Sequence, residues 1–247
     1  MPTITANTTD GHHQSGLQSD WDNTRETTGF NPGISDTENA FFGIRAAHTT
    51  SRGGKYFIVR SFFDFDVSGI DEVSSATFKD KSYVTTSATG IVLKSGHNPA
   101  DTSTNWYTTW LTGLGGSMSD WASGDTGVVE FSSATAAAAN GSFTTFTLNS
   151  DAISHINSIR GNTGSSALFK IVVMEYNHDY SNDTQADGVA ELTGYYFANH
   201  GTSGNRSNLD YTEAAAGYGH DVMGVGSSNI SKINGIATAN ISKVNGA

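Results

Sequence analysis

The chain has no cysteine, few basic residues and no long hydrophobic run, and each of these absences excludes a class of protein. Without cysteine there are no disulfides, thiolate metal ligands or thiol nucleophiles. The 13 Lys and Arg residues are outnumbered by 24 Asp and Glu residues, for a net charge of −11, and no segment carries the basic stripe that a nucleic-acid groove requires. No apolar run approaches the roughly 18 residues of a membrane span. We therefore expect no nucleic acid and no membrane among its partners.

Charged residues of either sign are scarce, and other polar residues take their place. Charged residues make up 15% of the chain, against a typical figure of about 25%, whereas Gly accounts for 28 of the 247 residues. Ser, Thr and Asn supply the remaining polarity, a composition typical of proteins that work outside cells. The first residues nevertheless lack the basic and apolar regions of a secretory signal. Release by lysis reconciles the two observations, so the composition favours a virion component that is extracellular after host lysis.

The clearest secondary-structure pattern is the alternation of residue types over positions 56–67. Positions of one parity are mostly apolar and are expected to face the core: Phe57, Val59, Ser61, Phe63, Phe65 and Val67. Positions of the other parity are expected to face outward: Ile58, Arg60, Phe62, Asp64 and Asp66. This alternation predicts a long strand that is central to the core.

About nine short strands, separated by turn residues, are predicted along the chain, with one helix among them. Besides 56–67, strands are expected at 3–8, 39–46, 76–84, 89–94, 128–131, 144–148, 167–176, 191–197 and 208–212. The helix is expected at 151–160, with Ser150 as its N-cap. Its buried stripe is expected to be Ile153, Ile156 and Ile159. These elements predict an all-β fold, a jelly-roll-like antiparallel β-sandwich with one short helix.

A strand signature in the chain resembles that of a known family. The run Arg60-Ser61-Phe62-Phe63-Asp64-Phe65-Asp66-Val67-Ser68-Gly69-Ile70 is similar to the R-x-L-L-R-F-D-L-S-x-I signature of DNRLRE domains, with Asp64 where the family usually has Arg. Similar family motifs match 73–78, Asn105-Trp106-Tyr107, the helix at 151–160 and the segment 200–211. The resemblance covers about two-thirds of the chain. It implies a β-sandwich related to carbohydrate-binding modules, and it speaks for the fold more than for an activity.

The C-terminal segment repeats itself every eleven residues. Three copies of one motif read Val222-Met223-Gly224-Val225, Ile233-Asn234-Gly235-Ile236 and Val244-Asn245-Gly246-Ala247. The recurring apolar positions are Val222, Val225, Ile230, Ile233, Ile236, Ile241 and Val244. One copy has too few apolar residues to fold alone, so the repeats predict burial against a partner surface. We expect an N-terminal arm with a first strand at 1–38, the sandwich at 39–214, and a tail for assembly or anchoring at 215–247.

The Asn-Ile-Ser-Lys-Val-Asn-Gly repeats of this tail resemble the C-termini of structural proteins of tailed bacteriophages. The resemblance implies a place in a virion, with the tail contacting other copies of the chain or other virion proteins. A homo-oligomer is expected, and a trimer is the preferred state by analogy with fibres and capsid decorations.

Four aromatic residues gather in a Gly- and Thr-rich excursion between predicted strands. They are Trp106, Tyr107, Trp110 and Trp121. Because aromatic faces stack on pyranose rings, these are candidate carbohydrate-binding residues for surface glycans, with Trp110 or Trp121 expected to stand partly exposed on a rim. The alternative is that they plug the open end of the sandwich.

Acidic residues supply the candidate metal and catalytic positions. Asp179, Asp183 and Asp187 lie in one loop and offer the hard oxygen ligands that calcium takes, although a solvated loop is the alternative. No other cofactor is indicated, since His12-His13 is expected in an exposed arm. Asp64 and Asp66 would stand roughly 7 Å apart on one strand face, a separation that glycoside hydrolysis permits. Two solvated carboxylates are the favoured alternative.

No G-x-S-x-G motif is present, and we expect no catalytic residue and no enzyme. The leading hypothesis is a non-enzymatic virion structural protein, a capsid decoration, head-fibre or tail-fibre component. A carbohydrate-binding module, free or appended, is the alternative, followed by a polysaccharide-degrading enzyme that uses Asp64 or Asp66.

Overall fold

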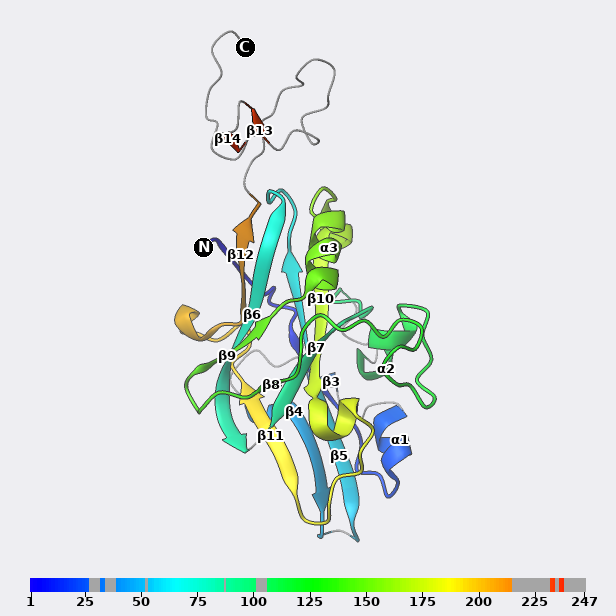
Figure 1. The fold of residues 1–247 in the computed structure, drawn as a ribbon. Helices are drawn as coiled ribbons and strands as arrows, with labels where there is room; N and C mark the ends of the chain where they lie inside the picture. The colour runs from blue at the N-terminus through cyan, green and yellow to red at the C-terminus, as the bar shows by residue number, and fades with distance from the viewer. Residues whose placement is uncertain are drawn as a thin grey trace. The chain divides into compact units, whose positions relative to one another are not determined.

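A computed structural model describes residues 1–26, 32–33, 39–51, 53–86, 88–100, 106–214, 232–233 and 236–237. The chain divides into two compact units, Met1–Thr212 and Glu213–Ala247. No helix in the described part is both long enough and apolar enough to cross a membrane. The first unit is an all-β antiparallel sandwich, as the sequence predicts (Figure 1).

Twelve strands of the first unit join in one continuous hydrogen-bonded arrangement. They are β1 (Thr3–Thr5), β2 (Gly11–Gln14), β3 (Pro32–Gly33), β4 (Asn39–Thr49), β5 (Lys55–Asp66), β6 (Val73–Thr86), β7 (Thr89–Lys94), β8 (Thr135–Ala136), β9 (Phe143–Thr147), β10 (Leu168–Glu175), β11 (Ala190–Tyr195) and β12 (Asn208–Glu213). The main order is β1-β12-β6-β11-β4-β5-β10-β7-β8. One predicted strand, 128–131, forms only an isolated bridge between Leu93 and Glu130.

The long strand β6 connects the two layers of the sandwich. Its Thr77–Lys81 part pairs with β9 in the layer that also holds β1 and β12. Its Ser82–Thr85 part pairs with β11, which continues into the layer of β4, β5, β10 and β7. A single strand can serve both layers because a twisted sheet bends along its strands.

The main core lies between these layers and is rich in phenylalanine. From β5, Phe63 and Phe65 point into it and meet Phe78 of β6 at ring centroid distances of 5.0 and 5.9 Å. The predicted inward parity of this strand is therefore confirmed for its second half, where Phe63, Phe65 and Val67 are all fully buried.

The expected outward face of β5 is not outward, and this part of the prediction is wrong. Phe62 belongs to a second core, and Arg60 and Asp64 are also fully buried. Of the charged positions on that face, only Asp66 is exposed. The reason is that the chain between β7 and β8 returns across the strand and covers Phe62 and Arg60, while Asn7 and Thr9 of the N-terminal segment cover Asp64.

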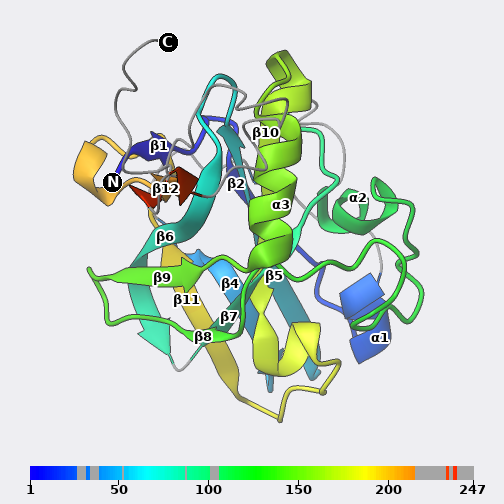
Figure 2. The same ribbon diagram turned by 45° about the horizontal axis from the view of Figure 1, so that its top comes forward.

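Three α-helices accompany the strands, although the sequence predicts one. The predicted helix is α3 (Ser150–Ile159), and its N-cap is Asn149 rather than Ser150, because the Asn149 side chain accepts the N–H groups of Asp151 and Ala152. It packs over β6 and β10 (Figure 2). The other two are α1 (Trp21–Glu26) and α2 (Trp106–Thr112), which lie on the same side of the sandwich (Figures 1 and 2).

The second unit contains one described pairing. Strand β13 (Lys232–Ile233) pairs antiparallel with β14 (Ile236–Ala237), with Ile233 opposite Ile236. Five of the predicted assembly positions lie outside the described residues: Val222, Val225, Ile230, Ile241 and Val244.

Candidate functional site

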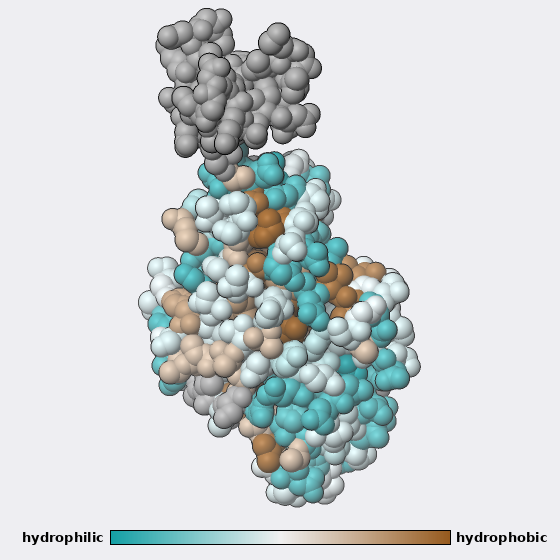
Figure 3. All heavy atoms as spheres, viewed as in Figure 1, coloured by the Kyte–Doolittle hydropathy of each residue, from teal (hydrophilic) through white to brown (hydrophobic). Residues whose placement is uncertain are grey.

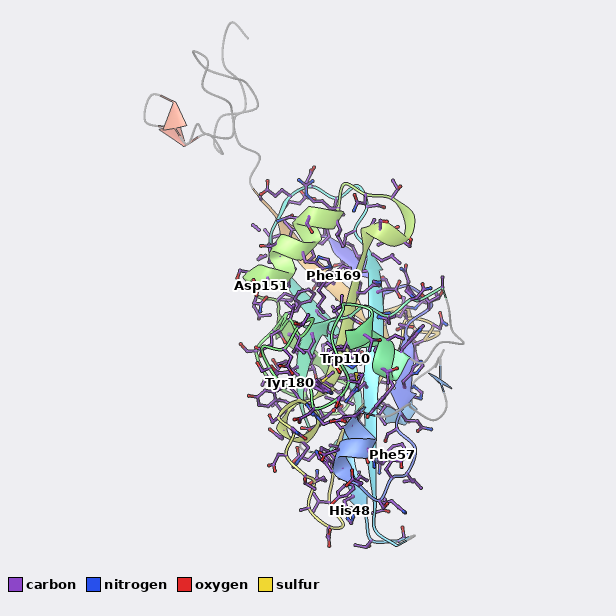
Figure 4. The ribbon with its side chains drawn as sticks, turned by 90° about the vertical axis from the view of Figure 1, so that its right-hand side faces the viewer. His48, Phe57, Trp110, Asp151, Phe169 and Tyr180 are labelled. Carbon is purple, nitrogen blue, oxygen red and sulfur yellow. The ribbon has the colours of Figure 1, made fainter. Side chains whose placement is uncertain are left out.

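The four candidate sugar-stacking residues are core residues. Trp106, Tyr107 and Trp110 are 0% exposed and Trp121 is 1% exposed. Trp110 and Trp121 contact each other edge to face, with ring centroids 5.1 Å apart. Figure 4 shows Trp110 beside α2, and both Trp110 and Tyr180 are buried, at 0% and 7% exposure. The expectation of an exposed Trp110 or Trp121 is wrong, because α2 and the chain after it turn these indoles onto the outer face of β5 and β10.

Two arginines and one aspartate lie inside this aromatic cluster. Arg60 donates from Nε to Asp179 Oδ2 at 2.7 Å and from Nη2 to Asp179 Oδ1 at 2.6 Å. Arg25 donates to the backbone oxygens of Asp179 and Trp121 at 2.6 and 2.8 Å. The Arg25 guanidinium lies 3.7 Å from the centroid of the Trp121 ring, and that of Arg60 lies 4.1 Å from that of Tyr107. The cluster thus joins α1, β5 and α2 to the turn that follows β10.

That turn is a single π-helical turn, Tyr176–Tyr180, held by Glu175. The Glu175 carboxylate accepts the backbone N–H groups of Asn177 and His178 at 2.8 and 2.7 Å. Burial, only partly offset by these two bonds, raises the pKa of Glu175 to about 7. The turn carries Asp179 into the interior, so Glu175 positions the carboxylate that pairs with Arg60.

The three loop aspartates do not form a metal site. Asp179 is fully buried and its carboxylate is bound by Arg60, whereas Asp183 and Asp187 are exposed. Asp187 lies 3.2 Å from His48 Nδ1 instead. Within the described ranges no three His, Asp or Glu side chains converge as metal ligands. The predicted calcium site is therefore wrong, because the Asp179 carboxylate lies in the interior whereas Asp183 and Asp187 lie at the surface.

The histidine pair also departs from expectation. His12 and His13 lie in β2, paired with Ser61 and Arg60 of β5, and they are 5% and 1% exposed. The His13 ring stacks on Trp106 at a centroid distance of 5.1 Å. Burial, with a smaller contribution from His13, lowers the pKa of His12 to about 3. These histidines are core residues of the sandwich and not part of an exposed arm.

Asp64 and Asp66, the weighed catalytic pair, have different surroundings. Asp64 is 0% exposed, and its two carboxylate oxygens accept from the Asn7 amide and the Thr9 hydroxyl. Burial raises the pKa of Asp64, against these two bonds and the nearby Lys170. Asp66 is exposed and accepts the N–H of Ser68 at 2.9 Å. The expectation of two solvated carboxylates thus holds for Asp66 and is wrong for Asp64.

A groove of about 560 Å³ opens next to Asp64. Its walls come from segments far apart in the sequence: the first turn of the chain, β5, Pro99 and Ala100 after β7, the start of β10 and the segment between β11 and β12. Arg206 is the second charged residue of its lining. The volume lies within the roughly 300–1,000 Å³ of small-molecule sites. Sequence reasoning missed this groove because its parts meet only in the folded chain.

Partly exposed aromatic rings form a row on the outer face of the sheet. Lys81 of β6 stands opposite Phe143 of β9, and its Nζ lies 5.9 Å from the Phe143 ring and 5.8 Å from the Tyr196 ring. Tyr83 contacts Tyr196 edge to face at 5.1 Å. All four side chains are half-buried. The sequence carries no signal for this row, because its members come from β6, from β9 and from the residue that follows β11.

No protein-family model matches the chain, and no curated protein matches its sequence. The interpretation of its function accordingly depends on the residues themselves.

Proposed function

We propose that the protein is a non-enzymatic virion structural protein, a capsid decoration, head-fibre or tail-fibre component. The observation that carries the proposal is the repeat segment, which falls in a compact unit of its own. Within it Ile233 pairs with Ile236, and Asn234-Gly235 stands between them in the sequence. Asn-Gly is the dipeptide most typical of a two-residue hairpin loop. The motif recurs in the sequence every eleven residues, and a single two-stranded hairpin of this size is too small to be stable without a partner.

The surface of the sandwich supports different roles for the two units, with the sandwich displayed and the tail used for assembly. Among the described residues the exposed large hydrophobic side chains are Met1, Leu17 and Val189, and these lie far apart in the sequence. Figure 3 shows a face dominated by hydrophilic and near-neutral residues, with hydrophobic ones in small patches. A face of this kind, without a large apolar patch, suits a displayed domain. Assembly is then assigned to the apolar residues of the tail.

The test is incorporation into particles. The tagged full chain and a chain that ends at Asp221 are produced in cells that make the particles, and the tagged protein in purified particles is quantified by mass spectrometry. We expect the full chain in particles and less than about a tenth as much of the truncated chain. Ile233→Asn is expected to act like the truncation, and Lys232→Asn, at the neighbouring position of β13, like the full chain. Absence of the full chain from particles, or equal incorporation of both chains, contradicts the proposal.

A carbohydrate-binding module is the second candidate function, and the outer aromatic row favours it. Phe143 and Tyr196 flank Lys81, whose Nζ donates to Asn205 Oδ1 at 2.6 Å. Rings beside an amide and an ammonium group can contact the faces and hydroxyls of a sugar. This function predicts glycan binding by the monomer and a dispensable tail. Binding that is lost in Tyr196→Ala but kept in the chain that ends at Asp221 would favour it.

A further inference from the structure

Among the described residues that line the groove beside Asp64, Arg206 is the charged group that a ligand can reach. Asp64 is fully buried, and Lys170 stands opposite it in the β5–β10 register. Arg206 is half-buried and uses only Nε as a hydrogen-bond donor, to the backbone oxygen of His200 at 2.9 Å. Its two terminal nitrogens have no acceptor in the part of the chain that the structure describes. Paired N–H groups of a guanidinium match the two oxygens of a carboxylate.

Hydroxyl and amide groups surround this guanidinium. Thr5, Asn7, Thr8 and Thr9 all line the groove, and Thr5 and Thr8 are exposed. Asp64 fixes the turn from the inside, because its carboxylate holds both the Asn7 amide and the Thr9 hydroxyl. The outward groups of the turn are therefore preorganised, which lowers the entropic cost of binding.

The rest of the lining is small and apolar: Ala6, Pro99, Ala100, Leu168 and Ala198. None of the described residues that line the groove is aromatic, so they offer a neutral sugar no ring to stack on. A small sugar ring that carries a carboxylate together with several hydroxyl groups offers partners to both the guanidinium and the hydroxyls. We propose that this groove binds a uronic acid unit, with its carboxylate on Arg206 and its hydroxyls on the 5–9 segment.

The inference is independent of the proposed virion role, because every lining residue belongs to the Met1–Thr212 unit. A failure of the tail to assemble leaves the groove intact. Conversely, if the groove binds no sugar, the proposed role of the tail in assembly is unaffected.

The experiment is an NMR titration of the full chain with three probes: galacturonate, galactose as its neutral counterpart, and acetate as a carboxylate alone. We expect galacturonate to bind with a Kd on the order of 1 mM, and the other two at least about tenfold more weakly. Arg206→Gln should weaken galacturonate binding by about tenfold or more. Arg160→Gln is the matched control, because Arg160 also donates to one backbone oxygen, that of Ile70, and lies outside the groove.

Three results overturn the proposal. They are unchanged galacturonate affinity in Arg206→Gln, acetate binding as tight as galacturonate binding, and no saturable galacturonate binding by the wild type. If Arg206→Gln does not fold, Thr8→Ala carries the test, because Thr8 is an exposed turn residue. That variant should bind galacturonate several-fold more weakly, and an unchanged affinity overturns the proposal.

Discussion

Arg60 and Asp179 lie 119 positions apart in the chain and form a two-point ion pair in the interior, with both side chains 0% exposed. Removal of one partner would leave the other as an uncompensated buried charge, which is the costly case. The pair ties β5 to the π-helical turn and, through the contacts of Arg25, to α1. These contacts hold α1 and the π-helical turn against the β5 side of the sandwich.

Asp179→Asn is expected to lower the free energy of unfolding by about 3–5 kcal/mol, because Arg60 keeps its charge and loses its partner. Urea unfolding measures the change. Asp183→Asn is the control, since Asp183 is exposed on the same loop, and it should change the value by less than about 0.5 kcal/mol. Equal, small effects of both substitutions would contradict this account of the ion pair.

Phe63→Ala is expected to cost about 3–5 kcal/mol by leaving a cavity among Phe78, Tyr195 and Phe197. The same unfolding measurement checks it, and Phe63→Leu should cost much less because it fills most of the volume. A loss below about 1 kcal/mol in Phe63→Ala would mean that the inward face of β5 is assigned wrongly.

Trp110→Ala should act on stability and not on sugar binding. The indole is fully buried against Trp121, so its removal is expected to cost about 3–5 kcal/mol. Galacturonate binding, measured on the folded variant, should stay at the wild-type level. Loss of glycan binding at unchanged stability would contradict the core assignment.

Glu175 makes stability depend on pH in a defined window. Its folded pKa is raised to about 7 from the ordinary 4.5, so above pH 4.5 the unfolded chain releases a proton that the folded chain keeps. The wild type should therefore lose about 1.4 kcal/mol per pH unit between pH 4.5 and 7, relative to Glu175→Gln. Unfolding free energies of both proteins across this range test the difference. A difference that does not vary with pH contradicts the raised pKa.

Local patterns in the sequence predicted much of the sandwich but not its second core. The alternation over β5 correctly placed Phe63 and Phe65 in the main core. It could not show that α2 returns to cover Phe62 and Arg60, because alternation within a strand carries no information on what a distant segment packs against. The helix α2 was itself missed, since its Thr and aromatic residues have low intrinsic helix propensity and are held by burial.

The candidate site shows the same limit. The sequence places the aromatic residues of α2 and Trp121 close together along the chain, but burial and not residue type decides whether an indole contacts a ligand. The sequence alone does not show that Asp179 is an interior ion-pair partner, because Arg60 lies on a distant strand. Likewise, the groove at Asp64 needs Arg206 and the 5–9 segment together, and only the fold brings them to one place.

If the repeat tail is an assembly element, the mass of the protein in solution shows it most directly. Sedimentation equilibrium should be run on the full chain and on the chain that ends at Asp221 at the same concentrations. The account predicts that the full chain associates, with a trimer of three times the 26.0 kDa chain mass as the preferred state, and that the truncated chain is monomeric. Equal masses for the two chains, whether both monomeric or both associated, would contradict it.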